Sequence, residues 1–153
     1  MYLSNGYPTL ENSYQTAIEY ADAGCRIMEV DFPSRNPYLE GQYIADRMAK
    51  ALEACDDYEK YMESMKMKKL LPEVHFLVLA YENTVEEIGT EHFIEFCKEN
   101  DFKDVLLVGL KGEIIKNQII ESGLKVSCYV QFHMLPEEIE SAKASNGFVY
   151  MQA

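Results

Sequence analysis

Short apolar runs alternate with amphipathic segments along the whole chain, and this alternation restricts the fold more than any other sequence feature. The apolar runs occupy residues 2–3, 25–30, 74–80, 105–110, 126–130 and 148–151. The central runs are continuous, which is typical of parallel strands that are covered on both faces. Between the runs, apolar residues recur with helical spacing. Six strands and five helices in strict βα order predict a parallel sheet with right-handed crossovers.

The predicted helices have recognisable ends. The first has apolar residues at 14, 17, 18 and 21 and is expected to end at Gly24, while the fourth, around residues 114–119, is expected to end at Gly123. The second is lined by residues 43–52 and is expected to continue beyond Asp56 in a second piece that ends near Lys69. The third is anchored by residues 93, 94 and 97. The fifth begins with Pro136, which suits a first helical turn.

Composition restricts the functions that the chain can have. Its 153 residues and 17.6 kDa suit one domain, and no stretch rich in proline, glycine or serine marks a boundary, so we expect a single domain over residues 1–153. The 14 basic and 26 acidic residues give a net charge of −12, which argues against nucleic acids and anionic membranes as partners. The first residues do not have the pattern of a signal peptide, and no apolar run is long enough to span a bilayer. We therefore expect the protein in the cytoplasm.

No metal or cofactor motif is present in the sequence. The four cysteines lie thirty or more residues apart, without histidines at ligand spacing, so we expect ordinary thiols and no metal site. The first strand–helix turn, Ser4-Asn5-Gly6-Tyr7-Pro8, has one glycine, and neither the dinucleotide nor the P-loop pattern occurs. We therefore predict no cofactor. Two architectures stay open at this point, an open doubly wound sheet and part of a (β/α)8 barrel.

The loop after the second strand carries the strongest candidate for chemistry. Glu29 lies within an apolar run, where an ionised carboxylate is costly to bury, so its side chain is expected to be paired, hydrogen-bonded or raised in pKa. A carboxyl group with a raised pKa suits general acid–base catalysis near neutral pH. The alternative is a structural carboxylate paired with Arg26 or Arg35. Residue type and position leave both interpretations open.

A second carboxylate, Glu40, follows eleven residues later. Pro33 and Pro37 stiffen the loop between the two, so Glu40 can fold back towards Glu29 and accept a hydrogen bond from a substrate. The alternative is an acidic residue that stabilises the start of the following helix.

These residues carry a resemblance to a known family. The segment from Gly6 to Ile44 resembles the tryptophan synthase alpha chain family, whose members are (β/α)8-barrel lyases. The family has a G-x-P turn after its first strand, present here as Gly6-Tyr7-Pro8. Its second strand ends in E-x-G-x-P-x-x-D-P-x-x-D-G-P-x-I, and the matching residues here are Glu29, Pro33, Pro37, Gly41 and Ile44.

Two further motifs extend the resemblance to the end of the sequence. The family's Y-x-N in strand 3 corresponds to Tyr81-Glu82-Asn83, and its G-Y-x-Y in strand 6 corresponds to Gly147-Phe148-Val149-Tyr150. The resemblance implies an α/β chain derived from the (β/α)8 barrel, with about six parallel strands and an incomplete barrel in a single chain.

The resemblance also implies a function in tryptophan biosynthesis, the cleavage of indole-3-glycerol phosphate to indole and glyceraldehyde 3-phosphate. By motif, Glu29 matches the general acid–base, Glu40 an aspartate that stabilises charge at the indole nitrogen, and Tyr150 a positioning tyrosine. Tyr81, Asn83 and Phe148 are the implied substrate-binding residues. The implied partner is a tryptophan synthase beta chain.

Several positions depart from the family pattern. Glu40 replaces an aspartate, Asp31 replaces a glycine beside Glu29, and Asn36 replaces an aspartate that helps to dock the beta chain. Asp31 adds a negative charge that is expected to raise the pKa of Glu29. The loops after strands 4 and 5 also differ from the family pattern.

The motifs of strands 7 and 8, whose turns hold the substrate phosphate in the family, have no counterpart in this sequence. The best substitute is Lys111-Gly112. We expect a fragment of a longer protein, a homo-oligomer that pairs its open sheet edges, or an open sheet with covered edges. The alternative functions are a diverged, non-catalytic module that binds or regulates a partner, and a structural oligomer.

Overall fold

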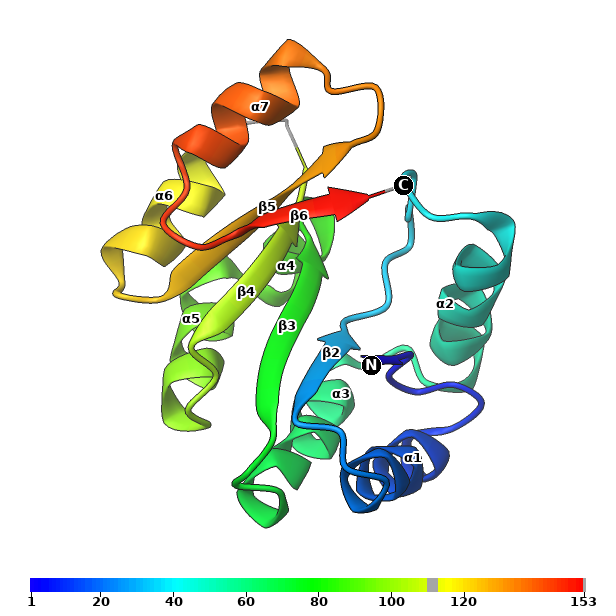
Figure 1. Cartoon of the computed structure of the whole chain (residues 1–153). Coiled ribbons are helices and arrows are strands. Elements are labelled where there is room, and N and C mark those ends of the chain that lie inside the picture. The colour runs from blue at the N-terminus through cyan, green and yellow to red at the C-terminus, as the bar shows by residue number, and fades with distance from the viewer. Residues whose placement is uncertain (110–112, 153) are drawn as a thin grey trace. The chain divides into compact units, whose positions relative to one another are not determined.

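A computed structural model describes residues 1–109 and 113–152, and its six strands follow one another in chain order, β1-β2-β3-β4-β5-β6 (Figure 1). The strands are β1 (Tyr2–Leu3), β2 (Ile27–Asp31), β3 (His75–Tyr81), β4 (Asp104–Val108), β5 (Lys125–Gln131) and β6 (Val149–Gln152). The pairs β1–β2, β4–β5 and β5–β6 are parallel, as the β-α order predicts. The chain divides into two compact units, Met1–Val78 and Leu79–Ala153.

Helices connect successive strands. They are α1 (Leu10–Asp22), α2 (Gln42–Ala54), α3 (Tyr58–Met65), the short 3-10 helix η1 (Lys66–Leu70), α4 (Glu82–Ile88), α5 (Thr90–Glu99), α6 (Glu113–Glu121) and α7 (Pro136–Lys143). Among the helices that the structure describes, none is long and apolar enough to cross a membrane.

The first unit is built around the apolar residues of β2. Met28 and Val30 of β2 and Phe32, which follows directly after it, are fully buried, and the helices α1 and α3 pack against each other. In the β1–β2 ladder, Tyr2 is the partner of Glu29 and Leu3 of Val30. The start of β3 joins β2 through a hydrogen bond from the His75 amide to the Arg26 carbonyl, 2.8 Å long. The β1–β2 ladder thus holds the short β1 in register beside the strand that carries Glu29.

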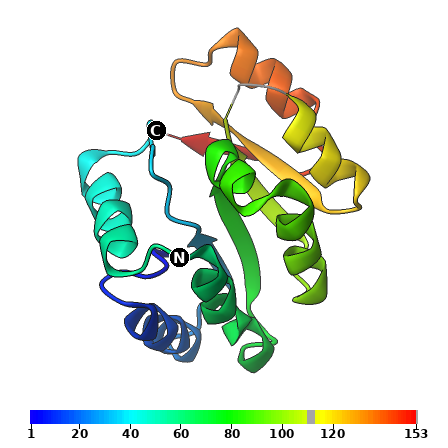
Figure 2. The ribbon, with the colours of Figure 1, turned by 180° about the vertical axis from the view of Figure 1, so that it is seen from behind.

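The second unit is built around β4 and β5. All five residues of β4 are buried, and α6 and α7 pack on β5, while α5 packs on α6. Figure 2 shows α4, α5 and α6 in front of the strands when the ribbon is seen from behind. Phe93 of α5, Phe102 before β4 and Ile119 of α6 belong to the core of this unit, and none of them is more than 1% exposed. Continuous apolar strands covered by helices match the pattern expected for parallel sheets.

The predicted helix ends are confirmed in part. Gly24 and Gly123 adopt φ values of +94° and +95° after α1 and α6, and Pro136 begins α7. The second predicted helix is interrupted because Cys55 is extended, and Asp57 then accepts a hydrogen bond from the Glu59 amide and caps α3.

The structure contains one helix, α4, that the sequence pattern does not predict. This helix of seven residues begins directly after Tyr81, within the stretch interpreted as a strand motif. Leu110, the predicted end of the fourth strand, and Lys111-Gly112, the predicted substitute for the phosphate site, lie outside the described residues.

Candidate active site at the end of strand β2

The carboxyl end of β2 brings acidic side chains to one face of the first unit. Side chains two residues apart on a strand point to the same face, so Glu29 and Asp31 share a face. Tyr2, the register partner of Glu29, lies on this face as well. The Glu29 amide donates to the Met1 carbonyl over 2.8 Å, so the backbone beneath the carboxylate belongs to the β1–β2 ladder.

Asp31 is the most enclosed of these acids, with 0% of its surface exposed. The Tyr2 hydroxyl donates to Asp31 Oδ2 and the Asn5 amide donates to Asp31 Oδ1, both over 2.6 Å. Burial raises the pKa of Asp31 to about 7; the two hydrogen bonds oppose this rise, and the negative charges of Glu40 and Glu29 add to it. The Asp31 carboxyl group therefore changes from protonated to ionised near neutral pH.

Glu29 and Glu40 are both half-buried. Glu40 ends the loop before α2, where its amide donates to the Pro37 carbonyl over 3.0 Å. Because both carboxylates act electrostatically on Asp31, the structure gathers three acidic side chains around the end of β2. Burial and the adjacent Asp31 also raise the pKa of the Tyr2 phenol, which keeps its hydroxyl as a donor.

Arg26 and Arg35, the two possible structural partners of Glu29, both make contacts close to β2. Arg26 Nη1 donates to the carbonyls of Ala21 and Cys25 over 3.1 and 3.0 Å. Arg35 forms an ion pair with Asp56. Arg26 lies directly before β2 and Arg35 in the loop after it, so these contacts fix the chain on both sides of the strand.

The loop between β2 and α2 is fixed to α3. The Tyr58 hydroxyl donates to the Pro33 carbonyl over 3.0 Å, and the Tyr58 ring packs edge-on against Phe32 at a centroid distance of 6.5 Å. The Asn36 amide donates to the hydroxyl of Ser34, which is buried. The loop that carries Glu40 is thus anchored at its start by packed aromatic rings.

The turn between β1 and α1 approaches the same site. Gly6 has a φ of +83°, and its amide donates to the Ser13 hydroxyl over 3.1 Å. A Cβ atom at Gly6 would lie 2.5 Å from Tyr61 Cε1, so the G-x-P motif requires glycine for both backbone conformation and space. Asn5 is buried, and among the described residues its Nδ2 has no hydrogen-bond acceptor.

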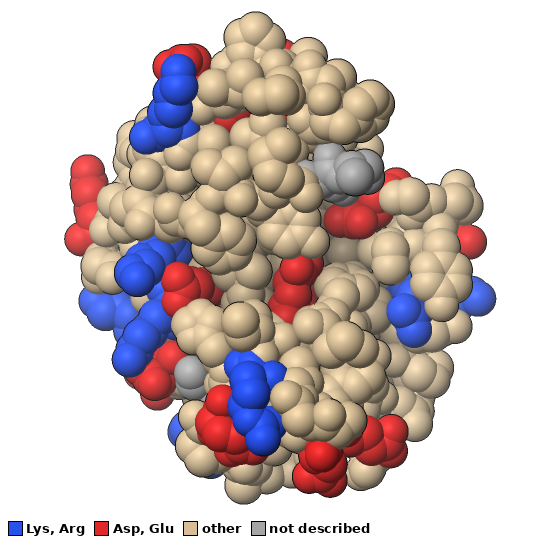
Figure 3. Space-filling model, in the orientation of Figure 1, with Lys and Arg blue, Asp and Glu red and all other residues tan. Residues whose placement is uncertain are grey.

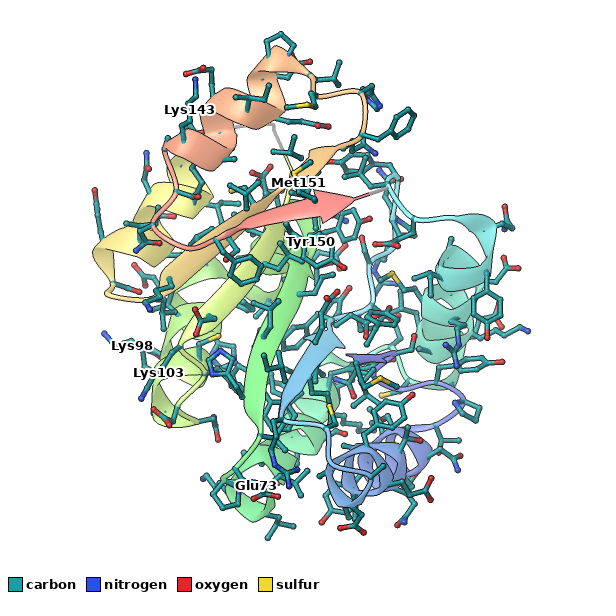
Figure 4. All side chains as sticks on the ribbon, in the orientation of Figure 1. Glu73, Lys98, Lys103, Lys143, Tyr150 and Met151 are labelled. Carbon is teal, nitrogen blue, oxygen red and sulfur yellow. The ribbon has the colours of Figure 1, made fainter. Side chains whose placement is uncertain are left out.

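The remaining candidate residues belong to the second unit. Tyr81 is the fully buried last residue of β3, and Asn83 lies half-buried in the first turn of α4. Phe148 is 48% exposed, and its backbone amide donates to the Ser127 hydroxyl. Tyr150 pairs in register with Tyr129 and is followed by the exposed Met151 on the opposite face of β6 (Figure 4).

Three residues that take part in the site are not indicated as site residues by the sequence. Tyr2 belongs to a run that indicates only a strand, Asn5 belongs to a turn, and Asp31 stands out only as a departure from the family pattern. The available signal was the charge of Asp31 directly after an apolar strand, because such a carboxylate requires donors.

The other titratable side chains in the described part of the chain include histidines and buried cysteines. Within residues 1–109 and 113–152, no group of three histidine, cysteine or acidic side chains is placed to hold a metal ion. Cys97 and Cys128 are buried, and burial raises the pKa of both thiols. On the face shown in Figure 3, several basic side chains gather at the left edge beside acidic ones, and the other charged side chains are scattered among uncharged surface.

Comparison with known proteins decides the family. The family model described as tryptophan synthase alpha chain matches residues 1–153. The chain belongs to the tryptophan synthase alpha chain family. A family member from Flavobacterium psychrophilum is 23% identical over 156 residues, covering 99% of this chain and 62% of the relative. One from Aquifex aeolicus is 30% identical over 113 residues, covering 73% of this chain and 43% of the relative.

Solved structures confirm the predicted fold class. Tryptophan synthase from Mycobacterium tuberculosis matches with a TM-score of 0.85 at 23% identity, over 98% of this chain and 60% of that one. Tryptophan synthase subunit alpha from Legionella pneumophila matches with a TM-score of 0.86 at 20% identity, over 99% of this chain and 60% of that one. The fold is therefore derived from the (β/α)8 barrel. The chain spans about three-fifths of the length of these relatives.

Proposed function

We propose that the chain supplies the acid–base residues of a lyase that cleaves indole-3-glycerol phosphate to indole and glyceraldehyde 3-phosphate. The observation that carries the proposal is the group of carboxylates at the end of β2, since Glu29 and Glu40 occupy the family's motif positions and both act on the buried Asp31. Family membership over residues 1–153 supports the same reaction.

In the proposed reaction, Glu29 moves protons and no net proton is consumed. A proton is added at indole C3, and the bond between C3 and the glycerol chain then breaks. Its electron pair returns to the indole ring, while the adjacent hydroxyl loses its proton and becomes the aldehyde of glyceraldehyde 3-phosphate. A carboxyl group that can hold and release a proton serves both transfers. Glu40 stabilises the positive charge that develops at the indole nitrogen.

The residues of the second unit complete the proposal by motif. Tyr150 is proposed as a positioning residue, and Tyr81, Asn83 and Phe148 as substrate-binding residues. Tyr81 is the last residue of β3 and Asn83 lies in the first turn of α4, near the carboxyl end of a strand, where barrel enzymes usually have their active site. Phe148 directly precedes β6 and Tyr150 is its second residue, so these two assignments rest on the motif alone.

The proposed partner is a tryptophan synthase beta chain. The support is family membership, while the docking position of the family pattern holds Asn36 in place of aspartate. Homo-oligomer formation through sheet edges stays a prediction. The exposed apolar side chains of Val149 and Met151 on β6 agree with it.

The test is indole release from indole-3-glycerol phosphate by the purified protein and by Glu29→Gln. Glu53→Gln is the matched control, because Glu53 is an exposed glutamate of α2 in the same unit. We expect release by the wild type and by the control, and loss of at least about a hundredfold in Glu29→Gln. Absence of release from the folded wild type would refute the proposal and favour the binding or partner-regulating module.

A further inference from the structure

Asp31 makes contacts that connect three separate parts of the candidate site. Its Oδ2 receives the hydroxyl of Tyr2 on β1, and its Oδ1 receives the amide of Asn5 in the turn before α1. Both bonds are 2.6 Å long and Asp31 is fully buried, so the carboxylate is held from two directions by the protein itself. The family pattern has a glycine at this position, which offers no side chain for either bond.

The first of these contacts fixes Tyr2 beside Glu29. Tyr2 and Glu29 are register partners in the adjacent parallel strands β1 and β2, so their side chains leave the sheet on the same face. The hydroxyl of Tyr2 reaches forward along this face to Asp31, two residues beyond Glu29. The phenol ring is therefore tied at both ends, by its backbone in β1 and by its hydroxyl at the end of β2.

The second contact fixes the turn that follows β1. The Asn5 amide is bonded to Asp31, and the next amide, that of Gly6, is bonded to Ser13 of α1. Asp31 thus joins the end of β2 to the turn and, through it, to the start of α1. Without the Asp31 carboxylate, the backbone amide of the buried Asn5 would lose its hydrogen-bond acceptor, which is costly for a buried backbone group.

We propose that Asp31 is a positioning residue of the candidate active site, which braces Tyr2 and the β1–α1 turn against β2 and so holds Glu29 in its working geometry. The effect on turnover rests on the proposed lyase function, whereas the brace itself does not. Small displacements of a catalytic group cost large factors in rate, so a brace of this kind acts on kcat rather than on substrate affinity.

The variants follow from the two hydrogen bonds. Asp31→Gly removes both, Tyr2→Phe removes the first alone, and Asp31→Asn keeps an acceptor for the Asn5 amide and offers an amide donor to the Tyr2 oxygen. Tyr20→Phe, which removes the hydroxyl of a half-buried tyrosine on α1, is the control for Tyr2→Phe.

In the indole-release assay we expect Asp31→Gly to lower kcat by about tenfold to a hundredfold, with KM changed by less than about threefold. Asp31→Asn is expected to restore most of the turnover, and Tyr2→Phe to add less than about a twofold loss in the Asp31→Gly background, because both residues act through one contact. Equal kcat values for Asp31→Gly and the wild type would overturn the positioning role. Should Asp31→Gly fail to fold, full turnover in Tyr2→Phe would overturn it instead.

A second measurement is independent of the reaction. Hydrogen exchange of the Asn5 amide, followed by NMR without substrate, is expected to accelerate by at least about tenfold in Asp31→Gly and to stay near the wild-type rate in Asp31→Asn and Tyr2→Phe. An unchanged exchange rate in Asp31→Gly would overturn the brace. If the wild type releases no indole but the Asn5 amide behaves as expected, the proposed lyase function fails and the brace stands.

Discussion

The energetic consequence of burying Asp31 is a dependence of stability on pH that one substitution removes. The pKa of Asp31 is about 7 in the folded protein, compared with its ordinary value of 3.8. At a pH between these two values, Asp31 is protonated in the folded protein and ionised in the unfolded chain. Ionisation therefore favours the unfolded chain, and the stability contributed by this residue falls as the pH rises from about 4 to about 7.

The magnitude follows from the two pKa values. Each pKa unit corresponds to about 1.4 kcal/mol, so the difference between 3.8 and about 7 amounts to about 4 kcal/mol once Asp31 is ionised. In the variant Asp31→Asn, the amide side chain cannot ionise and still offers an acceptor to the Asn5 amide. The variant is therefore expected to gain stability relative to the wild type by about 4 kcal/mol between pH 4 and pH 8.

The assay is urea unfolding followed by far-UV circular dichroism at several pH values, since the chain has no tryptophan for fluorescence. The difference between variant and wild type isolates Asp31, because the other acidic groups titrate in both proteins. A difference that stays constant from pH 4 to pH 8 would refute the burial argument. A stability advantage of Asp31→Asn that shrinks as the pH rises would refute it as well.

Three further substitutions test separate parts of the fold. Gly6→Ala is expected to lower the free energy of unfolding by at least about 2 kcal/mol, because it combines a φ of +83° with a Cβ 2.5 Å from Tyr61; urea unfolding checks this, and an unchanged midpoint would contradict the turn geometry. Thr9→Ala is expected to cost about 1 kcal/mol, because the Thr9 side chain accepts the hydrogen bond that caps α1; helix loss by circular dichroism is the readout. Glu113→Gln is expected to lower the free energy of unfolding more than Lys116→Met does. The Lys116 side chain is 3% exposed and that of Glu113 53%, so loss of Glu113 leaves a buried charge without its ion-pair partner. The reverse order of unfolding midpoints would contradict this.

Much of the fold was predictable because its determinants are local. Continuous apolar runs identified the strands, and Gly24, Gly123 and Pro136 identified helix ends. The interruption between α2 and α3 was less visible, because a helical apolar pattern continues across Cys55 and only the cap at Asp57 marks the restart. The short α4 was missed because its first residues extend a strand motif.

The candidate site was predictable only where a side chain conflicts with its neighbours in sequence. Glu29 within an apolar strand is such a conflict, and it directed attention to the end of β2. The partners of Asp31 were hidden, because Tyr2 and Asn5 are 29 and 26 residues away and meet it only through the β1–β2 register. Pairing between strands is set by tertiary packing, which residue spacing does not encode.

The central claim is that the carboxylate of Glu29 transfers a proton at indole C3, and deuterium exchange tests it most directly. Indole is incubated in D2O with the wild type, with Glu29→Gln and with the control Glu53→Gln, and loss of the C3 proton signal is followed by NMR. This test needs neither cleavage nor a phosphate site. The account predicts exchange above the buffer rate with the wild type and the control, and exchange at the buffer rate with Glu29→Gln. Equal exchange with Glu29→Gln and the wild type would contradict it.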